Sequence, residues 1–99
     1  MDQFTICRLR ESPNALVVIL QSDLNEHHGT LVAAPLVQSD LTKRVARINP
    51  MIEHDGQSYI LIMNKLGAVP VTEFGRPVGS AESQRDAISD ALDYLFKGF

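Results

Sequence analysis

The sequence has little cysteine, no long apolar run and no excess of positive charge, and each shortage excludes a class of protein. Its single cysteine, Cys7, excludes an internal disulfide framework and a zinc site built from several cysteines. The longest apolar run, residues 15–20, is far shorter than the roughly 18 residues that a membrane-spanning helix needs. The first residues lack the basic stretch and long apolar segment of a secretory signal, so we expect a soluble protein of the cytoplasm.

Charge and size narrow the possibilities further. Nine basic and 12 acidic residues give a net charge of −3 at pH 7, whereas sequence-independent binding to nucleic acid depends on a basic surface. Six glycines and five prolines among 99 residues are typical of a globular chain rather than a fibrous or disordered one. We therefore expect one domain over residues 1–99, with one core and little room for a deep active site.

Apolar runs rich in β-branched residues alternate with polar turns along most of the chain and predict a sheet. Asp55-Gly56 between two such runs is a strong hairpin signal, because glycine adopts a positive φ without strain. Pro35 and Pro70 have no N–H for a ladder, so their strands are expected to bend or to lie at an edge. We expect strands at residues 4–9, 15–20, 30–37, 51–54, 57–63 and 68–72.

Two of these runs are apolar on both faces. We expect the strand at residues 15–20 to be buried on both sides. Both faces of the run at residues 59–63 must likewise be packed against other parts of the protein. One face can pack against a helix, and the other against either the opposite part of the sheet or a second protomer.

The carboxyl-terminal residues show the pattern of an amphipathic helix. Ser80 is placed to cap its start and Gly98 to end it, and the glycines and proline at residues 75–79 indicate a turn before it. A second, short helix over residues 39–47 is indicated by few apolar positions. We therefore expect an α+β fold that is mainly β: a small, strongly bent antiparallel sheet or barrel with a helix on one side. The apolar stripe of the last helix comprises Ile88, Ala91, Leu92, Leu95 and Phe96.

The sequence contains no motif typical of catalysis, phosphate binding or metal binding. His27 and His28 lie in an expected loop without a further spaced ligand, so a solvated loop is the simpler interpretation. Residues 53–55 (Glu-His-Asp) fall at a hairpin tip, where exposed polar residues are usual. We therefore expect no catalytic residue, no metal ion and no cofactor. The spaced carboxylates of the last helix, Asp86, Asp90 and Asp93, are expected on its solvated face.

Of three further features, two have two interpretations each. Cys7 is expected to be a small buried hydrophobe in a strand, since no helix terminus or basic neighbour is placed to activate it. Lys43, Arg44 and Arg47 form a small basic cluster, which is either a solvated face or a contact for RNA or an acidic partner. Phe99 at the chain end either folds back onto the core or projects as an apolar anchor for another protein.

Short segments in a characteristic order give the sequence a family resemblance. Residues 10–12 (Arg-Glu-Ser) follow the first expected strand and residues 21–23 (Gln-Ser-Asp) follow the second. Residues 35–36 (Pro-Leu) and 69–71 (Val-Pro-Val) come later, and the last helix ends in Phe-x-Gly followed by an apolar residue at 96–99. In order, spacing and length, the chain resembles the CcdB family, the toxin half of a bacterial toxin–antitoxin pair that poisons DNA gyrase.

The resemblance implies an SH3-like barrel-sheet with a carboxyl-terminal helix, in a tight homodimer. It also implies a toxin without catalysis of its own, which binds the A subunit of DNA gyrase, traps the cleaved-DNA complex and is neutralised by a cognate antitoxin. Neither a nucleic acid nor a membrane is an expected partner. Arg85 and Asp86 fall in the family's functional surface, where we assign them to the antitoxin. The family's gyrase contact falls here on Leu24, Asn25, Asp93, Phe96, Lys97, Gly98 and Phe99.

Four of these positions depart from the family's best-known member. Lys97 stands where that member has a tryptophan, and lysine has no flat apolar face to stack into a partner. Asn25 replaces an apolar residue, Asp93 an amide and Arg85 an acidic residue. These departures imply a contact patch that is either adapted to another host's gyrase or lost.

Two other functions remain open from the sequence. One is a ribonuclease on the same fold, because the MazF-type toxins resemble this family in architecture. It would need an arginine beside an acid or hydroxyl at a phosphate, and Arg44, Arg47 and Arg76 are the candidates. The other is a binding protein that kept the fold without toxicity, an alternative suggested by Lys97.

Overall fold

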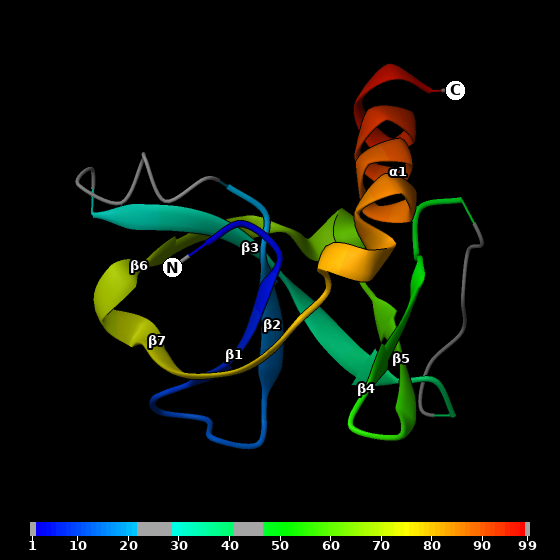
Figure 1. The fold of residues 1–99 in the computed structure, drawn as a ribbon. Helices are drawn as coiled ribbons and strands as arrows, with labels where there is room; N and C mark the ends of the chain where they lie inside the picture. Colours follow the sequence, from blue (N-terminus) through cyan, green and yellow to red (C-terminus); the bar gives the residue numbers. More distant parts are fainter. Residues whose placement is uncertain (1, 22–28, 41–46, 99) are drawn as a thin grey trace.

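The computed structural model describes residues 2–21, 29–40 and 47–98. Within these ranges, seven antiparallel strands form one sheet that curls into a half-barrel, and a single α-helix follows it (Figure 1). This confirms the expected α+β class. The strands are β1 (Thr5–Leu9), β2 (Leu16–Ile19), β3 (Thr30–Gln38), β4 (Met51–His54), β5 (Gln57–Leu61), β6 (Gly67–Pro70) and β7 (Phe74–Ser80). The helix is α1 (Arg85–Lys97), and the 3-10 turns are η2 (Met63–Lys65), η3 (Val71–Glu73) and η4 (Glu82–Gln84).

The central strand of the sheet is β3. The strand order is β4-β5-β3-β2-β1-β7, and β6 also pairs with β3. One edge of β3 pairs with β2. Along its other edge, residues 30–33 pair with β6 and residues 36–38 pair with β5, so Pro35 lies where the partner strand changes. Its carbonyl accepts a hydrogen bond from the Ile62 N–H at 2.9 Å, but no ladder bond depends on its missing N–H. An edge position for this strand is therefore wrong, whereas Pro70 does end an edge strand, β6.

The β4–β5 hairpin confirms its sequence signal. Asp55 and Gly56 form the turn with φ of 53° and 80°, and His54 pairs with Gln57 beside it. Positive φ at both turn residues matches the right-handed twist of the two strands, which is why Asp-Gly is favoured here.

The expected turn at residues 75–79 is wrong, because these residues belong to strand β7. β7 pairs with β1, and the register shifts on both sides of the Cys7–Pro77 pair. An edge strand tolerates Pro77 because one side of its backbone needs no partner. Gly75 allows the two backbones to approach closely, since a Cβ atom there would lie 3.0 Å from the Arg8 carbonyl oxygen.

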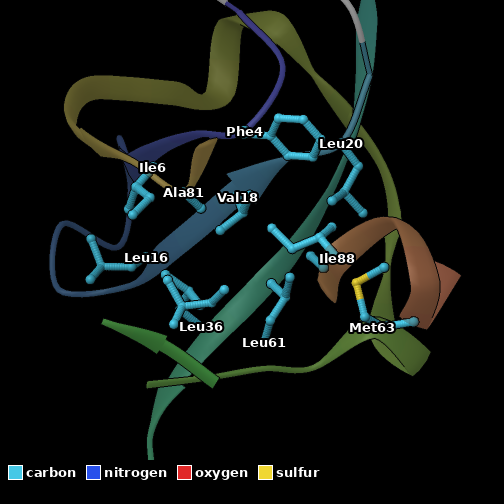
Figure 2. Packing of buried hydrophobic residues seen from close by; sticks show 13 residues of the cluster. Phe4, Ile6, Leu16, Val18, Leu20, Leu36, Leu61, Met63, Ala81 and Ile88 are labelled. Atoms are coloured by element: carbon cyan, nitrogen blue, oxygen red, sulfur yellow. The ribbon is translucent and has the colours of Figure 1, made fainter. Parts of the chain in front are cut away.

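The core has two parts, one on each side of the sheet. The larger part lies inside the half-barrel, where residues of β1, β2, β3 and β5 meet Ile88 of α1 (Figure 2). Ala91 of α1 belongs to the same cluster. The smaller part lies on the other side and is closed by Phe74. All four residues of β2 are buried, as expected for a strand covered on both faces. The smaller part comprises Cys7, Val17, Ile19, Leu31, Ala33 and Phe74.

Helix α1 starts later than predicted and stops where predicted. The Ser80 Oγ accepts a hydrogen bond from the Glu82 N–H at 3.1 Å, but that bond lies at the start of the 3-10 turn η4, and α1 begins only at Arg85. Gly98 ends the helix with φ of 79°, and its N–H donates to the Tyr94 carbonyl at 2.8 Å. Of the predicted apolar stripe, all but Phe96 packs on the core.

Some predictions fall outside the residues that the structure describes. They include residues 41–46 of the helix expected at residues 39–47. The first two residues of that segment, Ser39 and Asp40, are described and form a turn. They also include His27 and His28, and the basic residues Lys43 and Arg44.

Candidate functional site

The carboxyl end of α1 projects beyond the sheet (Figure 1). Phe96 lies in its last turn and is 70% exposed, which is the largest exposure of a bulky apolar side chain among the described residues. Asp93 and Lys97 are also exposed and lie three residues before and one residue after Phe96. Because residues at i, i+3 and i+4 of a helix are neighbours, the three side chains share one surface. We call Asp93, Phe96, Lys97 and Gly98 the α1-end patch.

The α1-end patch contains four of the seven residues predicted to contact gyrase. The other three, Leu24, Asn25 and Phe99, lie outside the described residues.

Arg85 and Asp86 lie at the opposite end of α1. A helix of this length separates its ends by about 18 Å at 1.5 Å per residue, so the pair belongs to a different surface. The Arg85 guanidinium lies 3.3 Å from Glu82 Oε1 and 3.9 Å from Asp86 Oδ1. All three side chains are well exposed, so these ion pairs add little stability and leave the charges open to a partner.

Arg47 lies against α1. Its guanidinium stands 4.4 Å from the centre of the Tyr94 ring and 3.9 Å from Asp90 Oδ2. Arg76, another arginine considered for a ribonuclease site, is an exposed residue of β7. Arg44 lies outside the described residues. The structure therefore does not gather the predicted arginines into one catalytic group within the described ranges.

Cys7 is fully buried, as predicted, and burial raises the pKa of its thiol to about 11 from 9.0.

At pH 8 we expect native Cys7 to react with a thiol reagent at least about 100-fold more slowly than the urea-unfolded chain, because a pKa that is two units higher lowers the fraction of thiolate by that factor. The raised pKa in the folded state also means that stability is lost as the pH rises from about 9 towards 11. Equal labelling rates at pH 8 would contradict this; no other thiol in the chain interferes.

A cavity of about 310 Å³ opens between the β1–β2 turn and the β4–β5 hairpin. We call it the hairpin pocket. Its walls come from four parts of the chain, which is why no sequence spacing indicated it. It is lined by Arg8, Asn14, Leu16, Leu36, Val37, Gln38, His54, Asp55 and Tyr59.

His54 is a wall of the hairpin pocket and not the solvated tip residue that was predicted. It is half-buried, whereas its neighbours Glu53 and Asp55 are exposed as expected. Its ring lies so close to β7 that a Cβ atom at Gly79 would be 2.8 Å from His54 Cε1. The alternation of side chains along β4 could have predicted that His54 is partly buried, because His54 lies on the same face of the strand as the buried Ile52.

Hydrogen bonds hold several polar walls of the hairpin pocket in place. Arg8 Nη1 donates to the Pro13 carbonyl at 2.7 Å. The Tyr59 hydroxyl and Gln38 Nε2 both donate to Gln57 Oε1, at 3.2 and 3.0 Å. The Tyr59 and His54 rings lie 6.1 Å apart at 53° and form a corner.

The described part of the chain offers neither a metal cluster nor a membrane-spanning helix. Within residues 2–21, 29–40 and 47–98, no three histidine, cysteine or acidic side chains come together to hold a metal ion. No helix in the same ranges has both the length and the apolar character needed to cross a membrane.

A family model and solved structures match this chain. The model described as CcdB protein matches residues 3–98. A crystal structure of an Mtb toxin is 20% identical with a TM-score of 0.75, covering 92% of this chain and 99% of that one. An endoribonuclease from a mycobacterial species is 15% identical with a TM-score of 0.80, covering 97% of this chain and 90% of that one. A mycobacterial endoribonuclease in complex with its cognate antitoxin is 14% identical with a TM-score of 0.79, covering 97% and 94%. At these identities the structures share the fold of this chain.

Proposed function

Because this chain belongs to the CcdB protein family, we propose that it is the toxin of a toxin–antitoxin pair and binds the A subunit of DNA gyrase, trapping the cleaved-DNA complex. The observation that carries the proposal is the exposed Phe96 at the projecting end of α1. The side chain projects between the exposed Asp93 and Lys97, and aromatic side chains are favoured anchors of protein interfaces. As a homodimer, the protein presents two such anchors to a gyrase that is itself dimeric.

The charges around Phe96 set the character of the contact. Lys97 has an ammonium group where the family's best-known member has an aromatic ring, so Phe96 supplies the apolar area of this patch. Asp93 and Lys97 place opposite charges beside the ring, which favours a target surface with complementary charges. The α1-end patch is therefore adapted to one host's gyrase.

We assign the cognate antitoxin to the other end of α1. Arg85, Glu82 and Asp86 offer exposed charges there, about one helix length from Phe96. One of the matched structures is a complex with an antitoxin, which supports an antitoxin partner for this fold. A flexible antitoxin tail reaching from these charges towards Phe96 would cover the gyrase contact.

A gyrase assay with the host's own enzyme tests the proposal. The purified protein should inhibit supercoiling and accumulate cleaved DNA linked to gyrase, and added antitoxin should reverse both effects. Absence of cleaved complex at a molar excess of the protein would overturn the proposal. Degradation of RNA by the pure protein would instead favour the ribonuclease function, which the names of two matched structures suggest.

A Lys97→Trp variant separates a gyrase poison from a non-toxic binding protein. If the wild-type chain poisons its host's gyrase, the variant should change affinity by about tenfold or less, because Phe96 already provides the apolar anchor. Gyrase binding that appears only in the variant would show that the natural chain has lost the function. Affinity for the immobilised A subunit of gyrase is the measurement.

A further inference from the structure

We propose that the hairpin pocket binds one nucleotide unit, a base with its phosphate, at a site separate from the gyrase contact. The pocket is lined by β1, β2, β3 and the β4–β5 hairpin, and no residue of α1 lines it. A volume of about 310 Å³ is at the lower end of the range for small-ligand pockets and suits one nucleotide. The unit can come from a free mononucleotide or from a single-stranded RNA.

Arg8 is the phosphate-binding group of the pocket. Its bond to the Pro13 carbonyl uses one of five guanidinium N–H donors and fixes the position of the others. Among the described residues no carboxylate forms an ion pair with Arg8. A positioned guanidinium with free donors fits a phosphate group in a bidentate manner.

The other walls suit a base. The rings of Tyr59 and His54 form the corner described above, and unpaired bases stack on such side chains. Leu16, Leu36 and Val37 give an apolar floor. The side-chain amides of Asn14 and Gln38 are the donors and acceptors that read base edges.

Asp55 limits the charge of the ligand. Its carboxylate lines the pocket and repels every negative charge beyond the one that Arg8 holds. A phosphodiester, which carries one negative charge, is therefore preferred to a monophosphate, which carries about −1.5 to −2 at pH 7, and both are preferred to a triphosphate. This requirement agrees with the net charge of −3, which opposes binding of a long polyanion but not binding of a single phosphate beside an arginine.

Titration of the full-length protein with adenosine and uridine monophosphates, and in parallel with a short single-stranded RNA, tests the proposal. At about 50 mM salt, NMR shifts should be confined to the pocket residues. Equal affinity per site for the mononucleotides and the RNA would identify a free nucleotide as the ligand. An affinity for the RNA that is tenfold or more above that for the mononucleotides would identify a single-stranded RNA as the ligand. Shifts with neither probe, or only with an acidic peptide titrated in parallel, would overturn the proposal.

Variants of three residues make the test specific. Arg8→Gln should weaken binding about tenfold, and Asp55→Asn should strengthen it several-fold while keeping the positive φ that asparagine tolerates. Arg76→Gln is the matched control, since this exposed arginine does not line the pocket and its loss should change nothing. Equal weakening by Arg8→Gln and Arg76→Gln would show unspecific attraction and overturn the proposal. Phe96→Ala should leave nucleotide binding intact, so failure of the gyrase proposal and failure of this one are distinguishable.

Discussion

Replacing Ile88 with alanine is expected to lower the free energy of unfolding by about 2–5 kcal/mol. Ile88 is 1% exposed and points from α1 into the core beside Leu61 and Met63 (Figure 2). Its loss removes buried apolar area and leaves a cavity at the contact that holds the helix on the sheet. Since the whole stability of such a domain is about 5–15 kcal/mol, the loss is a large fraction of it. Urea unfolding followed by circular dichroism should show the midpoint fall by roughly 1–3 M.

Ser89→Ala is the matched control for Ile88→Ala. Ser89 is the next residue of α1 and is exposed, so its replacement should stay within about 0.5 kcal/mol of the wild type. Similar unfolding midpoints for the two variants would mean that α1 is not held by the Ile88 contact.

The features that the sequence predicts correctly are those determined by neighbouring residues. Asp55-Gly56 forms its hairpin because positive φ is a property of the turn itself. Gly98 ends α1 for the same kind of local reason, and the spacing of Ile88 and Ala91 defines the buried face of the helix.

The features that the sequence misses depend on residues far apart in the chain. Gly75 and Gly79 resemble turn residues, but one accommodates the Arg8 carbonyl and the other the His54 ring. The hairpin pocket is missed for the same reason, because its walls come from several strands and from two turns. Pro35 shows the limit of a local rule, since its strand changes partners there instead of lying at an edge.

The position of Phe96 depends both on neighbouring residues and on parts of the chain far from it. Its spacing places it on the apolar stripe of α1, which predicts a buried side chain. The carboxyl end of the helix projects beyond the sheet (Figure 1). The same spacing therefore leaves the Phe96 side chain 70% exposed. The exposure depends on the length of α1 relative to the sheet, and no pattern within the helix contains that information.

Replacing Phe96 with alanine is expected to weaken gyrase binding about 30- to 150-fold, which corresponds to roughly 2–3 kcal/mol for an aromatic anchor. The free energy of unfolding should stay within about 0.5 kcal/mol of the wild type, because the side chain is already 70% exposed. Induced expression in the host should then no longer arrest growth, and the purified variant should trap little cleaved DNA.

Asp86→Ala is the control for Phe96→Ala, because it removes an exposed side chain from the same helix at the opposite end. It should leave gyrase binding unchanged and weaken binding of the antitoxin, so the two variants separate the two surfaces of α1. Wild-type trapping of cleaved DNA by Phe96→Ala would place the gyrase contact elsewhere on the molecule. Loss of trapping in both variants would mean that gyrase contacts the whole outer face of α1, and the antitoxin would then neutralise the toxin by competing for that same face.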